Sequence, residues 1–151
     1  MHGIRPIYSA LLLASFTTSA ASWGNGCPAG ETNYFSCSQP KVVALCGEPG
    51  GAGLHLVLNG LNLGRGSDFF LRHISGEQRE RYQLSFTSHG SHYLLFDDYR
   101  KTPLPPSDVQ GLVVTNPDGV QKRLDCHQGY NKLEALAGKL DEPPTEPQQA
   151  P

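Results

Sequence analysis

Two histidines in the run H-G-S-H at positions 89–92 have the spacing that most resembles a pair of metal ligands or bases. On a helix this spacing would place both imidazoles on one face, where they could bind zinc. The residues around them predict a hairpin instead, and side chains on the two sides of a hairpin tip diverge. The nearest acids, Asp97 and Asp98, lie a strand-length away. We therefore expect no metal site and no cofactor.

A hydroxyl nucleophile could be assembled from Ser88 or Ser91 with His89 or His92 as its base. Hydrolytic chemistry also needs a third group that orients the base. The chain contains no G-x-S-x-G elbow, which would display a serine on a strand-to-helix turn. We predict a protein without catalytic residues. A small hydrolase or metal-binding protein that uses His89 and His92 is the alternative.

Two further patterns resemble chemical sites. Asp97 and Asp98 are adjacent, so a strand would point them to opposite faces, and they could not share a substrate. We expect both at a strand end in water. The glycines of residues 60–66 are followed by neither Lys-Ser/Thr nor a helix, which argues against a phosphate loop.

The hairpin tip is the strongest candidate for a contact surface, because loops held on a stiff scaffold often carry function. Its polar residues are compact and lie at the end of two strands. The predicted partner-binding residues are Ser88, His89, Gly90, Ser91 and Tyr93. The alternative is an ordinary tight turn.

Alternating residues between positions 81 and 97 give the clearest strand signal in the sequence. Glycine takes positive φ freely and histidine tolerates it, so a two-residue turn at His89-Gly90 would set Phe86 opposite Tyr93 and Leu84 opposite Leu95. On the reverse face of the return strand, the side chains of His92, Leu94 and Phe96 alternate too. We therefore expect this strand to be covered on both sides, as in a sandwich or barrel.

The rest of the chain supports the same architecture. Short apolar runs recur between Gly, Pro and Asn clusters, with a strong turn signal at N-P-D-G, positions 116–119. We predict a mainly β fold, an antiparallel β-sandwich or small barrel of about eight strands. The stretch 59–67 is predicted as a loop. A short C-terminal helix is expected, capped by Asn131, with an apolar stripe of Leu133, Leu136, Ala137 and Leu140.

The N-terminus has the order of a secretory signal. One basic residue, Arg5, precedes a short apolar run and then small residues, so we expect a signal peptide over residues 1–21, cleaved after Ala21. The mature protein would be periplasmic or secreted, with a single disulfide-stabilised β domain at 22–140. Residues 141–151 hold four prolines and no large apolar residue, which predicts a disordered tail. No later segment is apolar enough to span a membrane.

Four cysteines remain in the mature chain, and an even number in a small exported domain indicates disulfides. There is no C-x-x-C spacing, which argues against a zinc ribbon or a thioredoxin-type redox pair. These cysteines are Cys27, Cys37, Cys46 and Cys126. Three disulfide pairings are possible, and in each of them one bond joins Cys126 to the N-terminal region.

Charge limits the choice of partner. Without Arg5, the mature chain has 11 basic and 14 acidic residues, a net charge near −3, and the charges are spread along the sequence. Such a chain does not favour nucleic acid. We expect a protein partner in the periplasm.

The motifs C-P-A-G-E at 27–31, F-S-C at 35–37, K-V-V-A-L-C-G at 41–47 and G-S-H-Y-L-L-F-D at 90–97, with the late Cys126, resemble a group of small exported proteins of Gram-negative bacteria whose activity is uncharacterised. The resemblance covers most of residues 27–140. It implies a periplasmic address and disulfides, and it implies no activity.

The hairpin also resembles that of the periplasmic lysozyme inhibitors, which are small all-β proteins with an S-G-x-x-Y hairpin that enters the lysozyme cleft. Gly90 and Tyr93 match this motif, and His89 stands where the motif has serine. The resemblance implies a non-enzymatic interaction protein, an inhibitor or immunity-type partner of a cell-wall-active enzyme such as lysozyme. A structural envelope protein is a further alternative.

Overall fold

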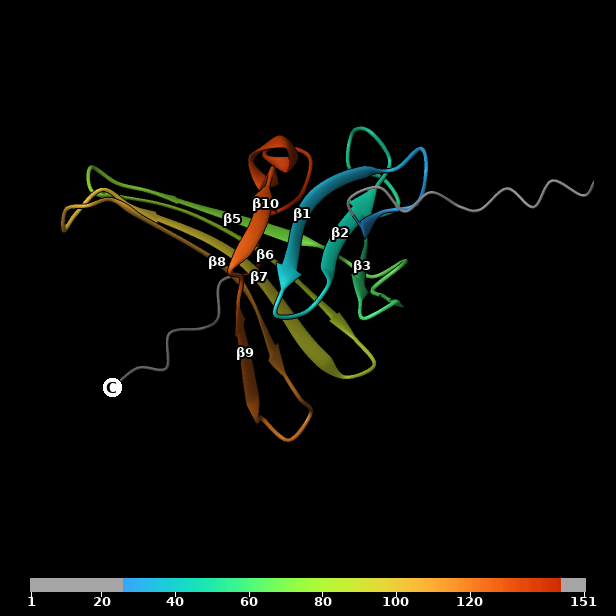
Figure 1. Ribbon diagram of the computed structural model, residues 1–151. Coiled ribbons are helices and arrows are strands. Elements are labelled where there is room, and N and C mark those ends of the chain that lie inside the picture. Colours follow the sequence, from blue (N-terminus) through green and yellow to red (C-terminus); the bar gives the residue numbers. More distant parts are fainter. Residues whose placement is uncertain (1–25, 145–151) are drawn as a thin grey trace, which may run out of the picture.

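The computed structural model describes residues 26–144, which form two antiparallel five-stranded sheets that pack face to face as a sandwich (Figure 1). The sheets do not close into a barrel. The short sheet has the order β10-β1-β2-β3-β4, and the long sheet follows the chain as β5-β6-β7-β8-β9. The strands of the short sheet are β1 (Thr32–Gln39), β2 (Val43–Gly47), β3 (His55–Leu58), β4 (Leu61–Leu63) and β10 (Gln128–Asn131). Those of the long sheet are β5 (Phe70–Ser75), β6 (Arg79–Ser88), β7 (Ser91–Arg100), β8 (Ser107–Thr115) and β9 (Gln121–Asp125).

Alternation along the strands builds the core between the sheets. Successive side chains on a strand point to opposite faces, so every second residue of β6, β7 and β8 faces the short sheet. Leu84, Leu95 and Leu112 lie in register across these three strands, and each is at most 2% exposed. Phe35 and Leu45 meet them from the short sheet. Removing this apolar area from water stabilises the sandwich.

The predicted register of the hairpin is confirmed. Phe86 pairs with Tyr93 and Leu84 pairs with Leu95 across β6 and β7. His89 and Gly90 form the turn with φ values of 51° and 76°. Positive φ at both central residues is the geometry of the two-residue turn that matches the twist of a hairpin.

Two disulfides hold the fold, and the pairing is Cys27–Cys46 and Cys37–Cys126. The second joins β1 to the residue that follows β9, and therefore ties the N-terminal part of the domain to Cys126, as expected. Two disulfides are compatible with an exported protein. In the described part of the chain, no helix has the length and apolar character needed to cross a membrane.

The fold differs from the prediction at the edges of the short sheet. There are ten strands, not about eight, because the stretch predicted as a loop at 59–67 contains β4, and β10 pairs with β1. The C-terminal helix is a single 3₁₀ turn, η2 (Leu133–Leu136). In a 3₁₀ turn the side chains at i and i+3 align, which is how both Leu133 and Leu136 reach the core.

The expected cover over both faces of β7 is found only in part. Its outer face carries Phe96, which is 1% exposed, but two arginine side chains shield this ring instead of a third layer. His92 on the same face is exposed. The other long side chains of the outer face are therefore available to solvent.

The two chain ends are only partly described. The predicted signal peptide at 1–21 and most of the predicted tail at 141–151 lie outside residues 26–144. The start of the tail packs on the long sheet, because Asp141 forms a parallel bridge with Phe70 and its carbonyl accepts a hydrogen bond from the Leu71 amide (2.9 Å).

Candidate functional site

The hairpin tip presents a small surface. Ser88 is 9% exposed, and its hydroxyl lies 3.0 Å from Nδ1 of His89. A Cβ at Gly90 would stand 3.3 Å from Cγ of Pro117, so the tip rests beside the turn at 116–119. Among the predicted contact residues, only His89 and Gly90 are exposed.

Tyr93 belongs to the core instead of the tip surface. Its ring is stacked on Phe86, with 4.9 Å between centroids and 7° between planes, and the residue is 9% exposed. The contact surface that the tip itself presents is therefore His89, Gly90 and part of Ser91.

The structure does not bring His89 and His92 together. His89 is in the turn, while His92 pairs with Thr87 on the outer face of the long sheet. Within residues 26–144, neither belongs to a group of three candidate metal ligands, and the hydrogen bonds of His89 include no carboxylate. The contact between Ser88 and His89 thus lacks the orienting acid of a catalytic triad in this part of the chain.

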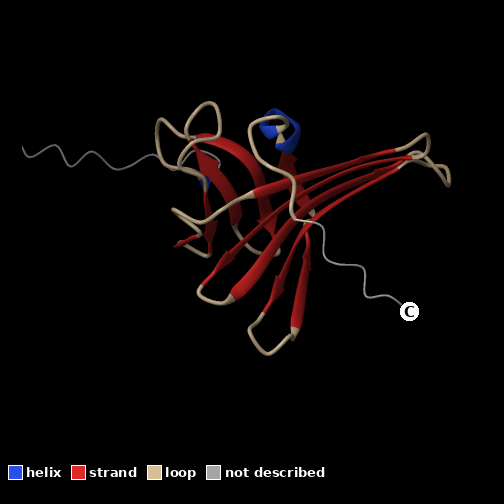
Figure 2. Cartoon of the chain, turned by 180° about the vertical axis from the view of Figure 1, so that it is seen from behind, coloured by secondary structure: helices blue, strands red, loops and turns tan. Residues whose placement is uncertain are grey.

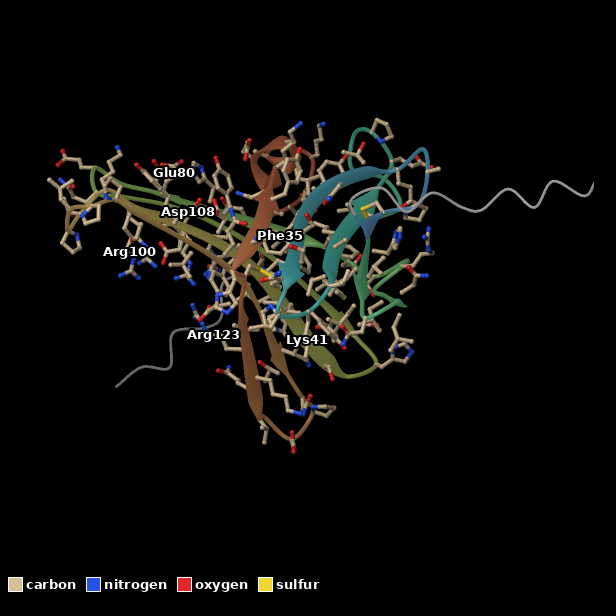
Figure 3. The ribbon with its side chains drawn as sticks, in the orientation of Figure 1. Phe35, Lys41, Glu80, Arg100, Asp108 and Arg123 are labelled. Carbon is tan, nitrogen blue, oxygen red and sulfur yellow. A yellow bond between two sulfur atoms is a disulfide. The ribbon has the colours of Figure 1, made fainter. Side chains whose placement is uncertain are left out.

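The outer face of the long sheet carries a concentration of positive charge that the sequence analysis missed. The register places five arginines on this face, here called the arginine face: Arg72, Arg79, Arg81, Arg100 and Arg123. The acids among them are Asp98 and Asp125. Figure 3 shows Arg100 and Arg123 below the ribbon, on the side away from Glu80 and Asp108.

Phe96 forms an aromatic floor at the centre of the arginine face. The guanidinium carbon of Arg123 lies 4.4 Å from its ring centroid, and that of Arg81 lies 5.9 Å away. The ring lies against Gly111, its neighbour on β8, where a Cβ would approach within 2.5 Å of the ring. Cation–π contacts hold the two guanidinium groups over the ring, and Nε of Arg123 also donates a hydrogen bond to Asp125 (2.8 Å).

Asp98 orients two other arginines of the arginine face. Arg79 donates two hydrogen bonds to its carboxylate, each 2.6 Å long, and Arg100 donates a third at 3.2 Å. The hydrogen bonds from Arg79, with that from Arg100, hold the pKa of Asp98 below its ordinary value, although burial acts against this. One carboxylate therefore orients two guanidinium groups that remain partly exposed, at 39% and 53%.

A groove of about 660 Å³ continues the arginine face toward the hairpin tip. Its floor is formed by Gln83, Ser85 and Leu94, and the start of the C-terminal segment forms one wall. Arg72 lines it at one end, and Thr87 and His92 line it at the other. The groove therefore connects the arginine face with the strand ends below the tip.

The opposite face carries the acids. At one end, the strands β5–β8 extend past β10 (Figures 1 and 2). This end contains residues 72–82 and 97–110 and is here called the arm. Glu80, Asp97 and Asp108 lie on the inner face of the arm, which continues the core face of the sheet. Figure 3 shows Glu80 and Asp108 together on its upper side.

Asp97 is the most perturbed of these acids. It is 9% exposed, and its Oδ1 has no hydrogen-bond partner within the described residues. Burial, followed by a hydrogen bond with the Asp108 carboxyl and the charge of that group, raises the pKa of Asp97 to about 7. Asp97 and Asp98 were expected in water at a strand end, and this was wrong, because both are buried within β7.

Comparison with protein-family models, with curated proteins and with solved structures finds no match for this chain.

A signal for the arginine face was present in the sequence. R-E-R at 79–81 and D-Y-R at 98–100 place charges two residues apart inside predicted strands, and residues two apart share a face. Reading the hairpin register across these two segments would have put Arg81 beside Asp98. Arg123 could not be added this way, because its strand was predicted without a register to β8.

Proposed function

We propose that this chain is a non-enzymatic protein that acts outside the cytoplasm and docks a protein partner that presents carboxylates to its arginine face. The observation that supports it best is the segregation of charge, with five arginines on one face of the long sheet. Charge complementarity of this kind guides association and selects partners.

The preorganisation of the guanidinium groups favours a carboxylate-bearing partner. Arginine presents a planar fork of N–H donors that matches a carboxylate with two parallel hydrogen bonds. Asp98 and Phe96 already hold four of the five side chains in place, so less rotamer entropy is lost when a partner binds.

The partner class that we propose is a cell-wall-active glycosidase such as lysozyme, with the chain as its inhibitor or immunity-type partner. Such enzymes hold a pair of carboxylates across an open cleft. The groove joins the arginine face to the hairpin tip, so a partner seated in it would also meet the tip residues His89 and Gly90. The tip is a second contact in this proposal.

A charge-reversal experiment tests the proposal. Arg72→Glu combined with Arg123→Glu changes the charge of the arginine face by four, and Lys41→Glu combined with Lys139→Glu makes the same change on exposed residues elsewhere. Binding to purified lysozyme, and to glycosidases captured from a periplasmic extract and then purified, would be measured by calorimetry. We expect at least about a tenfold loss of affinity, or about 1.4 kcal/mol, only in the arginine-face variant.

The dependence of the affinity on salt concentration gives an independent test. The affinity of the wild-type protein should fall as ionic strength rises, and the arginine-face variant should lose most of this dependence. Equal losses of affinity in both variants would mean that only the net charge of the protein matters, and would reject the arginine face as the docking surface. Absence of binding to every glycosidase tested would reject the partner class, and loss of binding on His89→Ala alone would move the contact to the tip.

A further inference from the structure

A second buried cluster lies on the outer face of the short sheet, away from the arginine face. Cys27, Ala44, Cys46 and Val57 pack there beneath the segment that precedes β1. His55 lies directly opposite Cys46 in the ladder between β2 and β3, and it is 0% exposed. A completely buried imidazole beside a disulfide requires a partner for each of its ring nitrogens.

One ring nitrogen of His55 is fixed by the backbone. Nδ1 lies 3.1 Å from the carbonyl oxygen of Gly53, which can only accept a hydrogen bond, so Nδ1 carries the proton. In the neutral ring, Nε2 then presents a lone pair. A backbone carbonyl on the other nitrogen is the arrangement that orients histidine as a metal ligand.

A second acceptor lies close to Nε2. Oε2 of Glu31 lies 3.3 Å from Nε2, is buried, and has no hydrogen-bond partner within residues 26–144. Two acceptors at this distance repel each other unless a positive charge joins them.

Arg65 supplies positive charge without closing this contact. Its Nη2 lies 3.1 Å from Nδ1 and 3.2 Å from Nε2 of His55, and 3.8 Å from Oε1 of Glu31. A group equidistant from both ring nitrogens cannot lie along the lone pair of either. The Arg65 side chain is 57% exposed, so it can move into solvent at little cost.

Sulfur completes the set of donors. A ring nitrogen of His55, a carboxylate oxygen of Glu31 and Sγ of Cys46 all lie within 4.8 Å of one another. Cys27 is bonded to Cys46, so a fourth donor atom is adjacent. Two thiolates, one imidazole and one carboxylate are a suitable tetrahedral set for Zn²⁺, but sulfur in a disulfide is not available as a ligand.

We propose that reduction of the Cys27–Cys46 disulfide converts this cluster into a zinc site made of Cys27, Cys46, His55 and Glu31. A small-molecule thiol supplies the electrons. The S–S bond breaks, two thiol molecules give two hydrogens to the protein sulfurs, and they are themselves oxidised to one disulfide. Zn²⁺ then replaces the two thiol protons, which are released to water, and Arg65 leaves the site.

The other disulfide provides an internal control. Cys37–Cys126 joins β1 to the end of the long sheet, and within the described residues it belongs to no group of three candidate ligands. If zinc recognises only thiolates, both pairs should bind it. If the site is the one proposed, the pair beside His55 should bind it much more tightly.

Thiol mapping tests the proposal on the full chain. The protein would be reduced with a phosphine, mixed with one equivalent of Zn²⁺, alkylated and mapped by mass spectrometry. We expect Cys27 and Cys46 to be protected at least about tenfold relative to Cys37 and Cys126, and Co²⁺ in place of Zn²⁺ to give thiolate charge-transfer absorption with tetrahedral d–d bands.

Substitutions identify the remaining donors. His55→Ala and Glu31→Gln should each weaken Co²⁺ binding by about tenfold or more, and Arg65→Gln should strengthen it, while His73→Ala is a matched histidine control. If reduction unfolds the chain, zinc should restore the β-sheet circular dichroism, because metal binding is coupled to folding. Equal protection of all four cysteines, protection of Cys37 and Cys126 instead, or no recovery of structure would overturn the proposal.

Discussion

The two faces of the arm differ sharply, although the same strands form both. Asp97 and Asp98 are neighbours on β7, and both are buried. Asp97 faces Asp108, and the pKa of Asp97 rises to about 7, while Asp98 faces Arg79 and Arg100, which lower its pKa. A step of one residue thus changes a carboxylate from an acid that retains its proton near neutral pH to a permanent counter-ion.

The comparison shows that the two faces of one strand can provide opposite electrostatic surroundings. The inner face continues the core and ends in acids at the uncovered end of the arm, where His73 donates to Glu80 and lowers its pKa. On the outer face, two guanidinium groups lie over the Phe96 ring, and this face suits a partner that presents carboxylates. Three changes, in order of decreasing effect, separate the two faces experimentally.

The largest effect is expected at Gly111, which makes room for Phe96 on the outer face. A Cβ there would lie 2.3 Å from the Leu124 carbonyl oxygen and 2.5 Å from the Phe96 ring. Gly111→Val should lower the free energy of unfolding by about 3 kcal/mol or more, because neither the backbone nor the ring can yield easily. Denaturant unfolding measures this loss.

Gly76→Ala is the control for that substitution. A Cβ at Gly76 meets nothing closer than 3.8 Å, and its φ is outside the positive region. It should therefore change stability by no more than about 0.5 kcal/mol. Comparable losses of stability in the two variants would contradict the proposal that Gly111 makes room for the Phe96 ring.

The next effect is expected at Asp98. Asp98→Asn removes the charge that accepts three hydrogen bonds from Arg79 and Arg100. We expect a loss of about 1–3 kcal/mol at pH 7, since hydrogen bonds to charged groups contribute in this range. Because the pKa of Asp98 is lowered in the folded protein, this stabilisation is present above the ordinary pKa and disappears as the pH falls through the folded value. Unfolding measured across acidic pH should show a flatter profile for Asp98→Asn than for the wild type.

The smallest effect is expected at Asp97, and it has the opposite sign. The pKa of Asp97 is raised to about 7, so between about pH 4 and pH 7 the folded chain retains a proton that the unfolded chain has lost. By linkage, the contribution of this group to stability falls as the pH rises through that window. Asp97→Asn should remove this decline and should leave the protein more stable than wild type at pH 8.

Asp108→Asn sharpens the same test. It removes the neighbour that raises the pKa of Asp97, so the decline should shrink without disappearing, because burial also contributes. Nuclear magnetic resonance of the side-chain carboxyl carbons would report the two titrations directly. An Asp97 titration close to the ordinary value of about 3.9 would contradict the proposed proton retention.

Much of the fold could be read from local patterns. The hairpin register followed from the alternation around His89-Gly90, because a slip of one residue would move Phe86 and Leu84 to the wrong face. The turn at 116–119 followed from its own residues, and the Asn116 amide bonds to the carbonyl oxygen of Val120 (2.9 Å). These features depend on neighbours in the sequence.

Most of the errors occurred where distant segments meet. An apolar stripe after Asn131 predicted a helix, but the core accepts only the single 3₁₀ turn that buries Leu133 and Leu136. β10 forms because the edge of the short sheet at β1 offers unpaired backbone groups, which this distant segment satisfies. No local pattern encodes that demand. β4 is different, because it pairs with β3 across the two-residue turn Asn59-Gly60, where both residues have positive φ. This local hairpin signal was overlooked.

The sequence by itself determined an antiparallel β fold, an even set of cysteines with one bond to Cys126, and the positions of the main turns. The tertiary structure alone decided which charges become neighbours. Arg79 and Arg123 are 44 residues apart in the numbering and share one face, because strand pairing brings them to the same side of the sheet. Electrostatic interactions depend on distance and burial in space, so charges that look dispersed along the chain can form one arginine face and one acidic face.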